Sequence, residues 1–276
     1  MLSIDRIRNF PIVLHARRAR YKRRFMHEKA GSFWGVYNTI DEARSSIESS
    51  LISDYSDEDL VDFNSDVFKK VNLFDWPVIF YLKTLISEQK TSSLVDFGGH
   101  VGAKYIAYRE LLDLPSEFSW HVVDLAPMVS KGRQIFTESS APHLSFSEDI
   151  TSDTRADILF CSGSLQYCPF TIIDVLNKFA RRPTHIILNK MPYSESGAFV
   201  TLENFERVKV PYHMFDRNEH DERLRSAGYD LVARWRLPYR DFDIPYAAPR
   251  RRVKMFGEIW SRRENATIDR GENGAV

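Results

Sequence analysis

The amino-acid sequence predicts an α/β fold built on a mostly parallel sheet whose last strand is antiparallel. An apolar run at residues 94–97 enters a glycine pair, and a helix-forming segment follows directly. From residue 93 onward, strand-like runs alternate with helical patterns, which is typical of a parallel sheet. Two later strand-like runs follow each other without a helix between them, so we expect them to pair antiparallel.

The segment before this core predicts a helical N-terminal extension or cap over residues 1–92. Charged residues are frequent at its start, and apolar residues recur at helical spacing towards its end. The expected elements are a basic helix over residues 1–30, an aromatic turn over 31–37, a helix capped by Thr39 or Asp41, acidic helical turns through Phe63 and a helix within 67–89.

The core is expected at residues 93–262, followed by a disordered tail at 263–276 that is polar and lacks periodicity. A long polar and aromatic connection is expected at residues 190–215. Strands are expected at 93–97, 120–123, 143–147, 156–161, 184–189, 229–235 and 253–260, and helices at 102–113, 127–137, 169–180 and 216–227.

Composition and charge argue against several classes of function. The formal net charge is zero, so the chain has no global signature of nucleic-acid binding. Its two cysteines, Cys161 and Cys168, have no zinc-ligand spacing and fit a reducing compartment. No apolar run has the length of a membrane span, and no signal peptide is recognisable. We therefore expect a cytoplasmic protein.

The basic segment at residues 1–30 has two interpretations. Its nine Lys and Arg residues face only two acids, Asp5 and Glu28. A solvated surface helix is the simpler interpretation. The alternative is weak contact of this helix with an anionic membrane surface or a phosphate-rich substrate.

The glycine-rich turn after the first core strand predicts a ligand site. Gly98 and Gly99 allow a tight turn and a close approach of the backbone to a ligand, because glycine has no Cβ. The helix after Gly102 offers free N–H groups at its N-terminus. In open α/β sheets the ligand lies beyond the carboxyl ends of the strands, which is where this turn lies.

Acidic residues follow the next two strands. Asp124 ends the second strand, where a carboxylate can accept hydrogen bonds from both hydroxyls of a ribose. Asp149 and Ile150 follow the third strand and are placed to reach the edge and the face of an adenine. The sequence therefore predicts an adenosine-containing ligand.

Two adenosine cofactors are compatible with these positions, and charge discriminates between them. Asp96 at the end of the first strand would repel the pyrophosphate of NAD but suits the cationic amino-acid part of S-adenosyl-L-methionine. The glycines lack the G-x-G-x-x-G spacing of dinucleotide-binding turns. They come closer to the D-x-G-x-G-x-G pattern of class I methyltransferases, with His100 at the middle glycine.

Several motifs also resemble a known family over about residues 33–260. They are Trp34-Gly35-Val36-Tyr37 with Asp41-Glu42-Ala43, the turn Val95-Asp96-Phe97-Gly98-Gly99, and the segment from His213-Met214-Phe215-Asp216-Arg217 to Trp235. The chain is similar to the S-adenosylmethionine-dependent methyltransferases often encoded among bacterial surface-polysaccharide genes. The resemblance implies a Rossmann-like class I methyltransferase core, S-adenosyl-L-methionine as cofactor and a role in polysaccharide biosynthesis.

Site residues are expected at the strand ends. Gln166, Tyr167 and Tyr193 are placed to line an acceptor pocket, although the tyrosines could equally be rim packing. His213 is the candidate general base, with a structural loop histidine as the alternative. The expected cofactor-binding residues are Asp96, Gly98, Gly99, His100, Gly102, Asp124, Leu125, Asp149, Ile150 and Ser162.

The predicted reaction is methyl transfer to a hydroxyl or amine of a small-molecule or saccharide acceptor. The sequence shows no convincing set of metal ligands, which argues against a magnesium-dependent, catechol-type mechanism. Two alternatives stay open. One is an NAD-dependent oxidoreductase, and the other is a methyltransferase-like binding protein without activity.

Overall fold

The computed structural model describes residues 11–27, 32–52, 70–88, 91–136, 141–205, 208–247 and 251–263. The predicted acidic helical turns up to Phe63 lie mostly outside these residues, and the predicted tail lies almost wholly outside them. Within the part that is described, no helix has both the length and the apolar character needed to cross a membrane.

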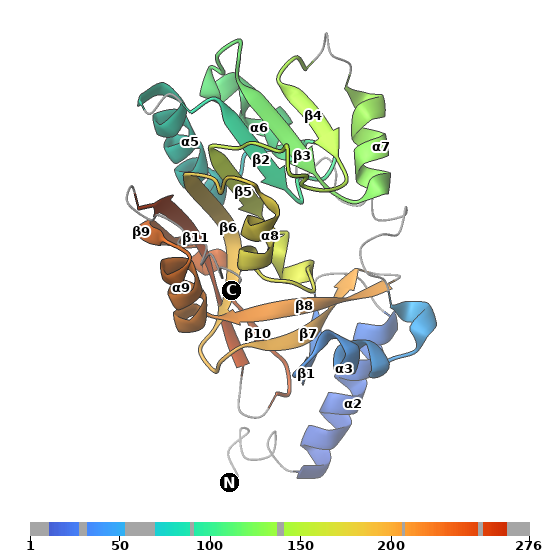
Figure 1. Ribbon diagram of the computed structural model, residues 1–276. Helices are drawn as coiled ribbons and strands as arrows, with labels where there is room; N and C mark the ends of the chain where they lie inside the picture. The colour runs from blue at the N-terminus through green and yellow to red at the C-terminus, as the bar shows by residue number, and fades with distance from the viewer. Residues whose placement is uncertain are drawn as a thin grey trace, which may run out of the picture.

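A mostly parallel main sheet confirms the predicted Rossmann-like fold class (Figure 1). Its strand order is β4-β3-β2-β5-β6-β11-β9. The first five of these are parallel, whereas β11 is antiparallel to both neighbours, as expected for the final strand pair. The strands are β2 (Ser93–Phe97), β3 (Ser119–Val123), β4 (Leu144–Ser147), β5 (Ile158–Ser162), β6 (His185–Ser194), β9 (Tyr229–Arg236) and β11 (Arg251–Arg262).

Helices cover both faces of this sheet (Figure 1). The consecutive residues Leu94 and Val95 of β2 are both buried because their side chains point to opposite faces. Leu94 packs with α5 and α6, and Val95 packs in the cluster that holds α8 and α9. The helices are α5 (Trp76–Glu88), α6 (Ala103–Leu112), α7 (Ala126–Ile135), α8 (Ile172–Lys178) and α9 (Arg217–Ser226).

A second, antiparallel sheet occupies two segments for which the sequence predicted no strands. The expected aromatic turn at 31–37 is strand β1, and the expected connection at 190–215 contains β7 and β8. Both faces of β7 are covered, since Phe199 packs on one side and Val200 on the other, so no clean alternation marks it in the sequence. The strand order is β1 (Phe33–Tyr37), β7 (Phe199–Phe205), β8 (Val208–Asp216).

Strand β6 belongs to both sheets. Its first half pairs with β5, and its last residues pair with β8 through Tyr193↔Phe215 and Ser194↔Asp216. Between the halves, the register against β11 shifts, and Lys190 adopts a left-handed φ of 61°. This is a β-bulge, which bends the strand and redirects its side chains.

The described residues before position 53 pack against the second sheet. Helix α2 (Pro11–His27) falls within the predicted basic helix, and Phe25 is its buried residue. The Asn204 side chain donates to the Phe25 carbonyl over 2.8 Å, which ties α2 to β7. Thr39 caps the following helix by accepting from the Glu42 N–H.

Short elements complete the fold. Strand β10 extends the sheet edge by pairing with β11, and the 3-10 turn over Leu73–Asp75 leads directly into α5. These elements are α3 (Ile40–Ser45), β10 (Phe242–Ile244), and the 3-10 turns η1 (Ser49–Leu51), η3 (Leu73–Asp75), η4 (Leu165–Tyr167) and η5 (Pro238–Arg240).

Two ion pairs of equal length connect the α5 region to α6 but differ in burial. Lys104–Asp75 and Lys83–Asp113 both have N···O distances of 2.8 Å, yet the first pair is buried and the second exposed. We expect Asp75→Ala to lower the free energy of unfolding by about 3–5 kcal/mol, because it strands a buried ammonium. Lys83→Ala is the matched control and should cost less than about 1 kcal/mol. Denaturant unfolding measures both, and equal losses would contradict this account.

Candidate functional site

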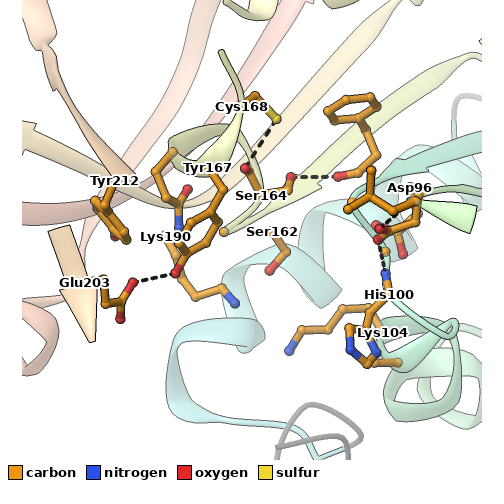
Figure 2. Close-up of a pocket in the computed structure, with 18 of the residues that line it drawn as sticks. Asp96, His100, Lys104, Ser162, Ser164, Tyr167, Cys168, Lys190, Glu203 and Tyr212 are labelled. Atoms are coloured by element: carbon orange, nitrogen blue, oxygen red, sulfur yellow. Dashed lines mark hydrogen bonds between the residues drawn. The ribbon is translucent and has the colours of Figure 1, made fainter. Parts of the chain in front are cut away.

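A cavity of about 1080 Å³ lies between the carboxyl ends of the main-sheet strands and the second sheet. The ends of β2, β3, β4 and β5 form one wall, and residues of β1, β7 and β8 contribute to the opposite one. Figure 2 shows Asp96 and His100 on one side of this space and Glu203, Tyr167 and Tyr212 on the other. The cavity therefore has two chemically distinct ends.

The glycine turn after β2 is close-packed and depends on both glycines. Gly98 has a left-handed φ of 72°, and its N–H donates to the Val123 carbonyl over 2.8 Å. A Cβ on Gly99 would lie 2.6 Å from the Asp96 carboxylate. The second glycine thus makes room for an acid at the strand end.

Asp96 is a buried acid with an unused acceptor. Its Oδ2 accepts a hydrogen bond from Trp120 Nε1 over 3.2 Å, whereas the buried Oδ1 has no hydrogen-bond partner among the described residues. Burial raises the pKa of Asp96 to about 7, and the Trp120 hydrogen bond opposes this rise. A cationic ligand would supply the partner that Oδ1 lacks.

Asp124 is oriented by backbone donors. The His100 N–H donates to Oδ2 and the Leu125 N–H to Oδ1, each over 2.7 Å. His100 adopts a left-handed φ of 57°, which lets its N–H reach this carboxylate. Burial raises the pKa of Asp124, and these two hydrogen bonds oppose the rise. Each oxygen keeps a further lone pair for a ligand hydroxyl.

Two site residues were predicted directly after β4, and only one of them, Asp149, lines the cavity. Asp149 forms an ion pair with Lys178, whose hydrogen bond is the main cause of the lowered pKa of Asp149. The Ile150 side chain is instead buried in the core cluster on the α8 side of the sheet. Ile150 therefore contributes to the hydrophobic core rather than to a cavity wall.

The end of β5 is a second tight turn. Ser162 lines the cavity, and its hydroxyl accepts from Asn189 Nδ2 at 3.5 Å. Gly163 has a φ of 77°, and a Cβ there would lie 2.9 Å from Lys190 Nζ. Gly163 therefore leaves the space in which the Lys190 side chain lies.

The bulge in β6 directs Lys190 into the cavity (Figure 2). Its neighbour Asn189 is fully buried, and Asn189 Nδ2 donates to Asp75 Oδ1 over 3.3 Å. Burial is the main cause that lowers the pKa of Lys190 to about 7, with a further contribution from Lys104. Lys190 and Lys104 thus line the part of the cavity between its two ends.

The far end of the cavity is aromatic and contains one carboxylate from β7. The Tyr167 hydroxyl donates to Glu203 Oε2 over 2.7 Å. The rings of Tyr167 and Tyr212 meet edge to face at 5.1 Å. Gln166 is also buried and lines the same cavity.

Most of the predicted site residues converge on the cavity, but Gly102, Tyr193, His213 and, as described above, Ile150 do not. Gly102 caps helix α6 behind the turn, and Tyr193 is buried against His220 and Phe256. His213 is placed on the opposite face of β8 from Tyr212, because neighbouring side chains of a strand alternate. The residues that line the cavity as expected are Asp96, Gly98, Gly99, His100, Asp124, Leu125, Asp149, Ser162, Gln166 and Tyr167.

Several cavity residues were not among the predicted ones. Glu203 and Tyr212 lie on strands that the sequence did not reveal, although a lone acid in the apolar run 199–205 was a usable signal. Lys190 directly follows a predicted strand, but the sequence did not predict the β-bulge that places its side chain in the cavity. Lys104 and Arg240 have no sequence signature that separates them from surface cations.

Comparisons with known proteins give only distant likenesses. No protein-family model matches the sequence, and no curated protein matches it. The structure of PH0226 from Pyrococcus horikoshii OT3 is similar at 12% identity and a TM-score of 0.47, with 75% of this chain and 99% of that chain covered.

Two structures with cofactors bound are also similar. Human N-acetylserotonin methyltransferase with S-adenosylmethionine has 14% identity and a TM-score of 0.48, over 90% of this chain and 66% of that one. Burkholderia thailandensis 1,6-didemethyltoxoflavin-N1-methyltransferase, with 1,6-didemethyltoxoflavin and S-adenosylhomocysteine bound, has 16% identity and a TM-score of 0.41, over 65% and 77%.

We expect Asp96→Asn to stabilise the protein without ligand. The ordinary pKa of an aspartate is 3.8, whereas the pKa of Asp96 in the folded protein is about 7. At pH values between these two, Asp96 is protonated in the folded state and ionised in the unfolded state. The free energy of unfolding of the wild-type protein therefore falls as the pH rises through this range. The gain should therefore grow from pH 5 to 7 and level off above, reaching about 1–3 kcal/mol. Thermal unfolding across this range measures it, with exposed Asp153→Asn as the control. A pH-independent difference would contradict the expectation.

Proposed function

We propose that this protein is an S-adenosylmethionine-dependent methyltransferase. The observation that carries the proposal is the buried Asp96 carboxylate, which has an unpaired oxygen beside a positive-φ glycine turn at the end of the first parallel strand. Such a site suits an ammonium group, since a cation supplies the partner the carboxylate lacks. It disfavours the pyrophosphate of NAD, which carries charge of the same sign.

The residues present fit this cofactor. Asp96 and the turn at Gly98–Gly99 would hold its amino-acid part, and Asp124 would accept from the ribose hydroxyls. Leu125 and Asp149 line the space beyond Asp124, where the adenine would lie. When bound, the cofactor supplies an electrophilic methyl group on a sulfonium. The chain supplies orientation and exclusion of water around it.

The acceptor would occupy the aromatic end of the cavity. Gln166 and Tyr167 lie there, together with Tyr212 and Glu203 of the second sheet. A hydroxyl or an amine of a small molecule is the proposed acceptor group. A saccharide acceptor and a role in surface-polysaccharide biosynthesis stay predictions that rest on the sequence resemblance alone.

Asp124→Asn should weaken binding of S-adenosylhomocysteine by about 10- to 100-fold, the expected cost of losing charged hydrogen bonds to hydroxyls. Isothermal titration calorimetry measures this. Asp113→Asn is the matched control, because Asp113 is exposed and its left-handed φ of 51° suits asparagine. Absence of binding by the wild-type protein at millimolar ligand, or tighter binding of NADH in a fluorescence titration, would refute the proposal.

The affinity for S-adenosylhomocysteine should increase as the pH is raised from 5 to 7. An ammonium pairs with the ionised form of Asp96, whose pKa burial raises to about 7, so each unit of acidification below that value costs up to about tenfold in affinity. Asp96→Asn should bind weakly and without this pH dependence. Calorimetry between pH 5 and 7 tests both, and the same slope in the variant would exclude Asp96 as the titrating group.

A further inference from the structure

Glu203 is the carboxylate that the second sheet contributes to the cavity wall. It lies near the centre of β7, where Phe33 of β1 and Val210 of β8 are its cross-strand partners. Oε2 accepts the hydrogen bond from Tyr167 described above, and Oε1 makes no hydrogen bond within the described part of the chain. One carboxylate oxygen is thus held in place and the other is available at the cavity wall.

The charged and titratable groups around Glu203 come from three elements. Tyr167 of η4 donates to it, Tyr212 lies on the neighbouring strand β8, and Arg240 lies on η5. Burial raises the pKa of Glu203 to about 7, while Tyr167 and Arg240 oppose the rise. Near neutral pH this carboxyl can both accept and release a proton, which is the property of an efficient general base.

The walls beside Glu203 are flat and apolar. The rings of Phe33 and Phe242 stack at 4.1 Å with an interplanar angle of 9°, and Tyr212 meets Phe33 edge to face at 5.3 Å. All three rings line the cavity. Offset and edge-to-face packing of this kind is the arrangement that aromatic ligands extend.

We propose that the acceptor is an aromatic compound with a ring hydroxyl, that Glu203 takes the proton from this hydroxyl during methyl transfer, and that Tyr167 is the residue that positions Glu203. This inference rests on the proposed methyltransferase function.

The chemistry balances without a further reactant. As the hydroxyl proton passes to Glu203, the acceptor oxygen forms a bond to the methyl carbon. The sulfur–methyl bond breaks, its electron pair stays on sulfur, and a neutral thioether leaves with the methylated product. Glu203 then returns the proton to water. A phenol, with a pKa of about 10, lies within reach of such a base, whereas an aliphatic alcohol is far less acidic.

The substrate class can be tested with four probes. Phenol and 2-naphthol represent aromatic hydroxyls, methyl α-glucoside a sugar and benzylamine an amine. Calorimetry on the protein saturated with S-adenosylhomocysteine measures their binding, and mass spectrometry measures methylated product formed with S-adenosylmethionine. We expect an aromatic hydroxyl compound to bind and to be methylated. The proposed substrate class is wrong if neither phenol nor 2-naphthol binds, or if neither is methylated. It is also wrong if the sugar or the amine is methylated in preference to them.

The role of Glu203 can be tested by substitution. Glu203→Gln should lower kcat by at least about 100-fold while the affinity for S-adenosylhomocysteine stays within twofold. Tyr167→Phe removes a hydrogen bond that lowers the pKa of Glu203, so the acid limb of the kcat profile should move to higher pH. Glu195→Gln, an exposed residue paired with Lys254, is the control and should leave both unchanged.

Two results would remove Glu203 and Tyr167 from these roles. Retention of more than a third of kcat by Glu203→Gln would exclude proton transfer to this residue. An unshifted pH profile in Tyr167→Phe would exclude its positioning role. If the wild-type protein binds no S-adenosylhomocysteine, the proposed function itself fails, which calorimetry distinguishes from the failure of this inference.

Discussion

The bulge at Asn189–Lys190 is the constraint on which the rest of the structure depends. It lets one strand serve the parallel sheet with its first half and hold the second sheet with its end. Opposite the bulge lies Gly257, where a Cβ would meet the Trp235 ring at 2.2 Å. Asn189 keeps the distorted backbone in place, since its Oδ1 accepts from the Lys190 N–H and its Nδ2 reaches Asp75. Without this bend the two walls of the cavity would not face each other.

The two buried carboxyl groups at opposite ends of the cavity have the same electrostatic origin but different surroundings. Burial raises the pKa of Asp96 and of Glu203 to about 7 in each case. One aromatic residue donates a hydrogen bond to each of them, the Trp120 indole N–H to Asp96 and the Tyr167 hydroxyl to Glu203. Such groups are costly to the folded state, so their presence in a cavity wall is typical of a site where stability has been given up for chemistry.

The sequence predicted the parallel core well because strands buried on both faces appear as continuous apolar runs. The predicted strand at 93–97 matches β2, and the paired runs near the end match β9 and β11. The second sheet was missed for two reasons. Both faces of β7 are covered, so the strand shows no clean alternation, and β1 pairs with a segment far away in the chain, which local periodicity cannot reveal. The same gap explains why Glu203 was not among the predicted site residues, since the direction of a side chain follows from strand alternation only once the strand is known.

The pairing of β1 with β7 has a consequence for how this chain reaches its native state. Thr201 donates to the Trp34 carbonyl, 167 positions earlier in the chain. During synthesis the segment of β1 is therefore made long before its partner β7, so its backbone groups and aromatic side chains lack their native partners until β7 is made. Closure of so long a loop is entropically costly and slow. We therefore expect the cavity wall that includes Phe33 to be among the last parts to form, so that aggregation can compete with its completion.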